Sequence, residues 1–413
     1  MRSFVIPFSL LILLLFAFVA CGEDSNEAST DDSGGSSDIV APGADDDESG
    51  DAGDATTGDV MYAPPLGSNP ALGYGPYKVV REFRHINDGD DEKGTFYIYR
   101  PQDLAGPYPT IIWGHGIMAS NRPSTQSEIY VRLASRGFLV IYPNLEVPFP
   151  FIHDDTVARS LRIYLRAARQ AVARGLADPD RIIFGGFSYG GRVAALATAW
   201  TGKLDPLDLW PNPVACVYEA MADFNREIGL PYEIPGPRAV DYVDYIDPTI
   251  PQTVIVAKDD ILCRNYGQGD QPLNGMLFYQ KLETNFAQLI VLQPGSTWQD
   301  RATHATFLMR NAQTLNAQDL WGHFKIIAGM MQYHFHGHSR HWAYGSMRSV
   351  GGLDHEGKII IHEVYERGDL FPGSDDGDES IGEEPSGEEI GTEQQNPDGP
   401  GAAEPDLENP PAD

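Results

Sequence analysis

The sequence predicts an α/β fold, a mostly parallel sheet with helices on both of its faces, flanked by two disordered acidic segments. Three observations support this prediction. Apolar, strand-like runs alternate with helix-like runs across residues 70–370. The strand-like run Arg181-Ile182-Ile183-Phe184 leads through a glycine-rich turn into a helix-like run at 192–197. In addition, 27 of the 59 acidic residues fall within residues 22–60 and 374–413, which contain no Lys or Arg.

The alternation begins with strands at 77–86 and 95–100, which an acidic turn at 87–93 separates. The uncharged run at 110–113 predicts a buried strand. A helix at 126–135 and a strand at 138–142 come next.

The run 155–174 is predicted to be a helix, because apolar residues recur at helical spacing from Val157 to Val172 and Gly175 ends the pattern. After the strand at 181–184 and its helix, strands are expected at 214–218, 253–257 and 288–292, with a helix at 275–282. A helix-like run at 318–333 and a strand-like run at 358–364 follow them. Sheets of this class bind ligands beyond the carboxyl ends of their strands.

Composition divides the chain into four parts. Residues 1–20 combine one basic residue with an apolar run too short to span a bilayer, which is typical of a signal peptide. We expect 21–69 to be an acidic disordered tether and 371–413 a second acidic disordered tail. The folded domain is expected at 70–370, with an extension after 305. Because the two tails carry most of the net charge of −30, that charge says little about the domain.

Cys21 directly follows the signal segment, after Phe18-Val19-Ala20. This arrangement resembles the cleavage box of bacterial lipoproteins, which implies a lipid on Cys21 and a place at the bacterial cell envelope or surface. Phe18 departs from the Leu, Val or Ile usual at its position. The alternative is signal cleavage without a lipid, which would give a secreted protein.

The turn Gly186-Phe187-Ser188-Tyr189-Gly190 is the most informative feature of the chain. A serine between a strand and a helix in this pattern is held in a strained backbone conformation, with its hydroxyl above the end of the sheet. Gly186 and Gly190 stand where a side chain would collide across the turn. The helix that follows directs free N–H groups toward the site, which favours a developing oxyanion. The pattern therefore predicts Ser188 as a nucleophile.

Candidates for the partners of Ser188 follow it in the order that such sheets use, a carboxylate and then a histidine. Asp259 and Asp260 come directly after the strand at 253–257. His304 follows the strand at 288–292 through a loop. Both positions are strand ends, so the three side chains are expected to meet at one edge of the sheet.

Together with Ile112-Trp113-Gly114-His115-Gly116-Ile117 and the run 133–141, these residues resemble the α/β-hydrolase superfamily. The resemblance covers about residues 75–310 and is greatest to the dienelactone hydrolase, chlorophyllase and cutinase-like polyester hydrolase branches. It implies the α/β-hydrolase fold, with Ser188 as nucleophile, His304 as base and Asp260 as the residue that orients His304. It also implies an oxyanion hole formed by the backbone N–H groups of Ile117 and Tyr189.

Asp260 is preferred over Asp259 because the acid of the family commonly lies three residues after a small strand-end residue, here Ala257. Asp259 remains the alternative, or a solvated turn residue or helix cap. His115 competes for the role of base, but its place in the oxyanion turn favours a structural hydrogen bond.

The sequence departs from the family pattern in two respects. Thr303 stands where the family usually has a glycine before the catalytic histidine, and the chain continues well beyond His304. His323, within this extension, is the reserve candidate for the base. Its apolar neighbours at helical spacing favour a packed helix instead.

If Cys21 carries lipid, Cys216 and Cys263 remain as an even pair outside the reducing cytosol. A disulfide between them and two separately buried thiols are both consistent with the sequence.

Three histidines, His334, His338 and His341, share one helical face, an arrangement that can bind Zn²⁺ or Ni²⁺. Because Gly337 interrupts this helix and no H-E-x-x-H motif is present, a partly exposed helix face is favoured and no metal site is predicted.

Together, these residues predict a serine hydrolase that cleaves carboxylic esters, small or polymeric, through an acyl-enzyme intermediate. No cofactor and no nucleic-acid partner is expected, since the chain shows neither a dinucleotide fingerprint nor a phosphate loop. Membrane contact is expected only through the lipid anchor. One alternative is a peptidase, because Ser188-Tyr189-Gly190-Gly191 also resembles the elbow of prolyl oligopeptidases. The other is a non-catalytic surface binding protein on the same fold.

Overall fold

A computed structural model describes residues 59–62, 73–86, 94–117, 127–145, 155–204, 210–223, 236–260, 263, 274–296, 301–308, 318–344, 352–353 and 358–368. All of them belong to one compact unit, Ala55–Asp413. The expected signal peptide, Cys21, most of the expected tether and the tail at 371–413 lie outside the described residues. Within the described part, no helix combines the length and the apolar character needed to cross a membrane.

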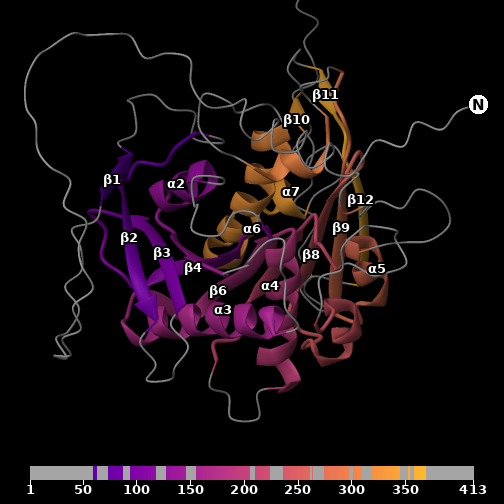
Figure 1. The fold of residues 1–413 in the computed structure, drawn as a ribbon. Helices are drawn as coiled ribbons and strands as arrows, with labels where there is room; N and C mark the ends of the chain where they lie inside the picture. The colour runs from indigo at the N-terminus through magenta and orange to yellow at the C-terminus, as the bar shows by residue number, and fades with distance from the viewer. Residues whose placement is uncertain are drawn as a thin grey trace, which may run out of the picture. The chain divides into compact units, whose positions relative to one another are not determined.

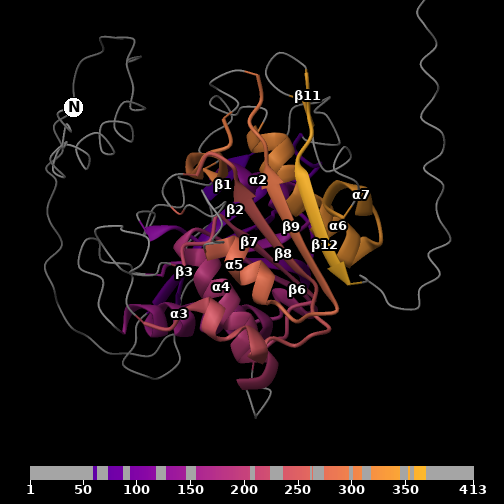
Figure 2. The same ribbon diagram turned by 90° about the vertical axis from the view of Figure 1, so that its right-hand side faces the viewer.

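Ten strands form one mixed sheet, in the order β1-β2-β3-β5-β4-β6-β7-β8-β9-β12 (Figures 1 and 2). The sheet contains β1 (Asp59–Tyr62), β2 (Val79–Ile86), β3 (Gly94–Pro101), β4 (Tyr108–Gly114), β5 (Leu139–Pro143), β6 (Ala177–Phe187), β7 (Ala215–Glu219), β8 (Gln252–Ala257), β9 (Phe286–Leu292) and β12 (Glu363–Gly368). A separate two-stranded sheet pairs β10 (Gly352–Leu353) with β11 (Ile359–Ile360).

The six central strands, β5-β4-β6-β7-β8-β9, are parallel to one another. The chain passes from β4 outward to β5 and then returns across β4 to β6, so the strand order reverses between β4 and β6. Crevices at such reversals, outside the carboxyl ends of the strands, are where open α/β sheets bind ligands. Gly114, at the end of β4, and Ser188, directly after β6, both lie at this point.

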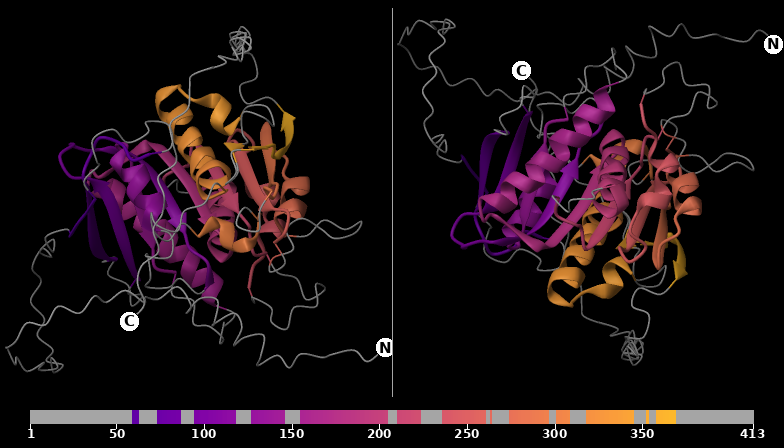
Figure 3. Two further views of the ribbon diagram at one scale, coloured as in Figure 1. Left: turned by 90° about the horizontal axis from the view of Figure 1, so that it is seen from above. Right: turned by 90° about the horizontal axis from the view of Figure 1, so that it is seen from below.

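Helices cover both faces of the sheet (Figure 3). Helices α3 (Thr156–Ala173), α4 (Tyr189–Ala199) and α5 (Asn274–Lys281) pack on one face. Helices α2 (Ser127–Ser135), α6 (Lys325–His336) and α7 (Arg340–Ala343) pack on the other. Alternate residues of each central strand enter the two cores. In β4, for example, Ile112 faces α3 while Ile111 and Trp113 face α6.

Short helical segments complete the described part: η3 (Trp200–Leu204), η5 (Ala239–Asp241), η6 (Val243–Tyr245), η8 (His304–Phe307) and η9 (Gln318–Phe324). The predicted helix at 318–333 therefore consists of two parts, a π-helical η9 followed directly by α6.

The edges of the sheet differ from the sequence-based expectation. Strand β1, at Asp59–Tyr62, pairs antiparallel with β2, so the expected tether at 21–69 is too long at its carboxyl end. The strand expected at 358–364 divides into β11 and β12, and β12 pairs antiparallel with β9. The extension after 305 thus adds a helical layer and an edge strand to the predicted parallel sheet.

Candidate active site

Ser188 lies at the apex of the turn between β6 and α4, with φ 56° and ψ −119°. A positive φ is unusual for a residue with a side chain and costs about 1–3 kcal/mol, so the surroundings must impose it. Neighbouring backbone does so on both sides. The Ser188 N–H donates to the Glu219 carbonyl at 2.8 Å, and the Ala222 N–H donates to the Ser188 carbonyl at 3.0 Å.

The glycines around Ser188 are required because backbone segments touch there. A Cβ on Gly190 would lie 2.1 Å from the carbonyl carbon of Gly114, and one on Gly186 would lie 2.4 Å from the Gly190 oxygen. Real Cβ atoms do not come so close to backbone atoms. The expectation that Gly186 and Gly190 leave room for the turn agrees with this geometry.

Asp260, His304 and Ser188 form a continuous hydrogen-bonded chain. The Ser188 Oγ lies 3.1 Å from His304 Nε2, and His304 Nδ1 lies 2.9 Å from Asp260 Oδ2. With Nδ1 donating to the carboxylate, Nε2 is free to accept the serine proton. The structure thus brings together the three side chains that the sequence grouped, from the ends of β6, β8 and β9.

The neighbouring carboxylate does not take this position. Asp260 is buried, and its Oδ1 accepts the Cys263 N–H at 3.0 Å. Asp259 is half-buried, and its N–H donates to the Ala302 carbonyl at 2.8 Å. This backbone bond holds the loop before His304 against the end of β8. The choice of Asp260 over Asp259 therefore agrees with the geometry.

Burial and neighbouring charges act on the pKa of His304 in opposite directions. Burial acts to lower its pKa, but the charges of Cys263 and Asp260 raise it, and the net pKa lies well above its ordinary value. Burial in turn raises the pKa of the Cys263 thiol.

The turn expected to supply an oxyanion hole lies beside Ser188. A Cβ on Gly116 would stand 3.4 Å from the Ser188 Cβ, so the backbone at Gly116 passes next to Ser188. Tyr189 is the first residue of α4, and the first four N–H groups of a helix have no acceptor within it. Ile117, directly after Gly116, is half-buried.

His115 is fully buried, and backbone groups occupy both of its ring nitrogens. Its Nδ1 lies 2.7 Å from the Gly116 carbonyl, and its Nε2 accepts the Leu145 N–H at 3.0 Å. Burial lowers its pKa to about 4, so the ring is neutral. These contacts match the expected structural hydrogen bonding, because no nitrogen remains to accept a proton from Ser188.

His323 pairs with Glu219. It lies on η9, fully buried, with Nδ1 2.5 Å from Glu219 Oε1, and its ring contacts Trp113 and Phe307 edge-on. Glu219 ends β7, and its backbone carbonyl accepts the Ser188 N–H. The pair therefore joins the extension to the strand that supports Ser188. Sequence reasoning did not identify Glu219, although its place directly after the strand predicted at 214–218 was visible.

A second buried pair, also not predicted, fixes part of the long segment between β7 and β8, which we call the insertion. Arg192, on α4, lies 3.5 Å from Asp223, and both side chains are fully buried. Asp223 also accepts the N–H groups of Ala239 and Val240, while Arg192 donates to the Pro237 carbonyl. These bonds attach the segment at 236–240 to the helix that follows Ser188.

The two cysteines are separate. Cys216 and Cys263 are both free and buried, so the structure contains no disulfide between them. Cys216 lies in the core of β7, whereas Cys263 lies beside Asp260 and His304. The histidines at 334–341 do not share one helix, because α6 ends at His336 and Gly337 adopts a left-handed conformation with φ 73°. His334 hydrogen-bonds the Tyr344 hydroxyl at 2.8 Å.

No protein-family model matches this chain, and no curated protein matches it. Among solved structures it is similar to a protein from Klebsiella pneumoniae subsp. pneumoniae MGH 78578, provisionally assigned as a dienelactone hydrolase. The two share 18% sequence identity with a TM-score of 0.41, over 59% of this chain and 95% of the other.

The strand order, the central parallel strands and the helices on both faces define an α/β-hydrolase fold, as the sequence predicted. Ser188, Asp260 and His304 occupy the loops at the carboxyl ends of its parallel strands.

Proposed function

We propose that this chain is a serine hydrolase that cleaves carboxylic esters through an acyl-enzyme intermediate. The observation that carries the proposal is the hydrogen-bonded chain from the Ser188 hydroxyl through His304 to the buried Asp260 carboxylate. A carboxylate that holds the imidazole in one tautomer, with the other nitrogen facing a serine hydroxyl, is the arrangement that activates serine as a nucleophile.

In the proposed reaction the Ser188 Oγ attacks the ester carbonyl carbon while His304 Nε2 accepts its proton. The tetrahedral oxyanion accepts hydrogen bonds from the backbone N–H groups of Ile117 and Tyr189. His304 then donates the proton to the leaving alcohol, and the acyl group stays on Ser188. Water, deprotonated by His304, releases the acid and restores the serine.

The strained conformation of Ser188 supports the same proposal. The φ of 56° is imposed by bonds to β7 and by the contact between Gly190 and Gly114. Strain of this kind is retained where the surrounding structure overdetermines it, and it is frequent at active sites.

The direct test is labelling of the full-length protein with a fluorophosphonate probe, together with turnover of short-chain nitrophenyl esters. Ser188→Ala is expected to abolish labelling and to reduce kcat by about 10⁴-fold or more. Ser135→Ala, which removes a buried serine hydroxyl on α2, serves as the matched control and is expected to retain both.

Folded protein that neither reacts with the probe nor hydrolyses esters would contradict the proposal and favour a non-catalytic binding protein. Ser188-dependent labelling with cleavage of peptide amides, but not of esters, would favour the peptidase alternative.

We also propose that Cys21 carries a lipid that retains the protein at the bacterial cell envelope. The support is the sequence around Cys21. Detergent partitioning of the expressed protein tests this proposal: Cys21→Ala is expected to move it from the detergent phase to the aqueous phase. Wild-type protein found in the aqueous phase would contradict it.

A further inference from the structure

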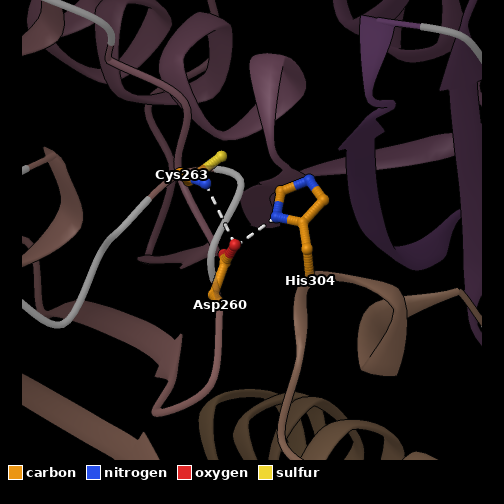
Figure 4. Close-up of side chains that lie close together, drawn as sticks. All are labelled: Asp260, Cys263 and His304. Atoms are coloured by element: carbon orange, nitrogen blue, oxygen red, sulfur yellow. Dashed lines mark hydrogen bonds and ion pairs between the residues drawn. The ribbon is translucent and has the colours of Figure 1, made fainter. Parts of the chain in front are cut away.

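The thiol of Cys263 lies within the candidate active site, although the proposed reaction does not use it. Cys263, Asp260 and His304 each offer a ligand atom, and these three atoms all lie within 4.8 Å of one another. Among the described residues this is the one group of three or more His, Cys, Asp or Glu side chains placed in this way. Figure 4 shows the three side chains together, with the Asp260 carboxylate hydrogen-bonded to the backbone N–H of Cys263 and to the imidazole of His304.

Hydrogen bonds to both the N–H and the carbonyl of Cys263 hold its backbone in place. Its N–H donates to Asp260 Oδ1 at 3.0 Å, and its carbonyl accepts the side-chain amide of Asn274. The residue is 1% exposed, and its sulfur lies within 4.8 Å of ligand atoms of both Asp260 and His304. The thiol therefore lies next to Asp260 and His304 and is shielded from bulk solvent.

The chemistry of the three donor atoms favours Zn²⁺ over Mg²⁺ and Ca²⁺. Thiolate, imidazole and carboxylate are the ligands of Zn²⁺, whereas Mg²⁺ and Ca²⁺ take oxygen ligands. Bond lengths of about 2.0–2.3 Å place the ligand atoms of a tetrahedral zinc roughly 3.3–3.8 Å apart. Separations of 2.9 Å between His304 and Asp260, and of at most 4.8 Å for the sulfur, approach that geometry within about 1 Å.

We propose that Asp260, Cys263 and His304 bind Zn²⁺ and that the bound metal switches off the hydrolase. The second half of this statement rests on the proposed function. Three protein ligands leave a fourth tetrahedral position, which water or the Ser188 hydroxyl fills.

Binding removes the base whichever ring nitrogen coordinates. The Cys263 thiol releases its proton to solvent when it becomes a thiolate ligand. If zinc binds Nε2, that nitrogen can no longer accept the Ser188 proton. If zinc binds Nδ1, the ring proton moves to Nε2, which then has no lone pair to offer. The Asp260 carboxylate coordinates the metal and no longer orients the imidazole.

Binding is tested first without reference to activity, using Co²⁺ as a spectroscopic substitute for zinc in the full-length protein. A thiolate-to-cobalt charge-transfer band is expected in wild type and in Ser188→Ala, and is expected to disappear in Cys263→Ala. Cys216→Ser, which alters the other buried free cysteine, and Cys21→Ser are the matched controls and are expected to keep the band. Absence of the band in wild type, or its persistence in Cys263→Ala, would overturn the proposal.

Inhibition is tested with nitrophenyl esters, each variant being compared with its own rate in the absence of zinc. Zinc is expected to abolish wild-type turnover reversibly, with full recovery on addition of a chelator. In Cys263→Ala, half-inhibition is expected to require at least about 10-fold more zinc, since changes even to outer-shell groups weaken metal sites by 10–100-fold. Equal sensitivity of the two proteins would overturn the proposal.

The two experiments separate failure of this proposal from failure of the proposed function. A protein without esterase activity that shows the Cys263-dependent cobalt band contains the metal site but is not the proposed hydrolase. An active esterase without the band is the hydrolase without the metal site.

Discussion

Ser188 adopts a conformation that its own side chain disfavours, and the reason lies in its neighbours. Its φ of 56° places the hydroxyl above the end of β6, where His304 Nε2 lies 3.1 Å away. Gly190 allows α4 to pass directly against Gly114 at the end of β4. Two glycines, one near Ser188 in the sequence and one at the end of another strand, therefore help to determine where the Ser188 hydroxyl stands.

Asp260 is predicted to orient His304, a role that its neighbour Asp259 does not share. Asp260→Asn is expected to reduce kcat/KM about 10³–10⁴-fold, because an amide no longer fixes the His304 tautomer or stabilises its protonated form. Asp259→Asn, one residue away, is the matched control and is expected to leave kcat/KM nearly unchanged. Steady-state kinetics with a nitrophenyl ester measure both, and a larger loss in Asp259→Asn would reverse the assignment.

The pH dependence of turnover is expected to follow His304. Burial lowers the pKa of this histidine while Cys263 and Asp260 raise it, and the net pKa lies well above 6.5. Only the neutral ring acts as a base, so kcat/KM is expected to fall as pH decreases, with a midpoint above the ordinary value of about 6.5. A pH profile of kcat/KM locates this midpoint. A midpoint below 6.5 would show that burial, rather than the negative charge, dominates at His304.

At this scale the sequence predicted which residue types form the site but not all of its neighbours. Ser188, Asp260 and His304 were predictable because each follows an apolar strand, in the order that the fold uses. The position of Cys263 was not, because hydrogen bonds from Asp260 and Asn274 fix it and no periodicity in the sequence reports such bonds.

At the scale of elements, buried charges attach the insertion between β7 and β8 to α4. Arg192 and Asp223 are both fully buried, and Asp223 accepts two backbone N–H groups from 239–240. Burial raises the pKa of Asp223, and the charge of Arg192 and the two backbone N–H groups oppose that rise.

Removal of this carboxylate is expected to destabilise the fold strongly. Asp223→Ala removes the carboxylate from beside the buried Arg192 charge and the acceptor from two backbone N–H groups, which costs about 3–5 kcal/mol in the free energy of unfolding. The matched control is Asp155→Asn, which breaks an exposed ion pair with Arg159 and is expected to cost at most about 1 kcal/mol. Denaturant titration compares the two. Similar losses in both variants would show that the buried pair contributes no more than the exposed one.

The central strands and their helices were predictable because uninterrupted apolar runs mark parallel strands that are covered on both faces. Among the helices, the one at 156–173 was predicted most accurately, since its boundaries fall within one residue of the expected 155–174. The antiparallel partner of β9 and the π-helical turn at 318–324 were not predictable. Both depend on packing between segments about 70–100 residues apart, such as Glu219 with His323.

At the scale of the whole molecule, β12 closes one edge of the sheet. All seven residues of β9 are buried, whereas Tyr365, Glu366, Arg367 and Gly368 of β12 are exposed. A charged outer strand leaves a poor template for pairing with another chain.

Loss of this strand is expected to cause association between molecules. A chain truncated after residue 358 presents the backbone of β9 as a new, apolar edge, and is expected to form larger particles than the full-length protein. A chain truncated after residue 373, which keeps β12 and loses the acidic tail, is the matched control. Light scattering coupled to size exclusion measures both. Equal particle sizes for the two truncated chains would show that β12 has no such protective role.

The distribution of Ser188, Asp260 and His304 across the sheet has a consequence for how the proposed activity could be lost. The serine stands on the central strand β6, whereas the aspartate follows β8 and the histidine follows β9, next to the edge strand. Regions near an edge open at a lower free energy than the centre of a sheet. A molecule whose last strands have opened would keep the turn at Ser188 and most of its core. In that molecule His304 would no longer lie beside Ser188. If the proposed function is correct, esterase activity therefore reports the integrity of the β8–β9–β12 edge, and an inactive preparation can still consist of largely native protein.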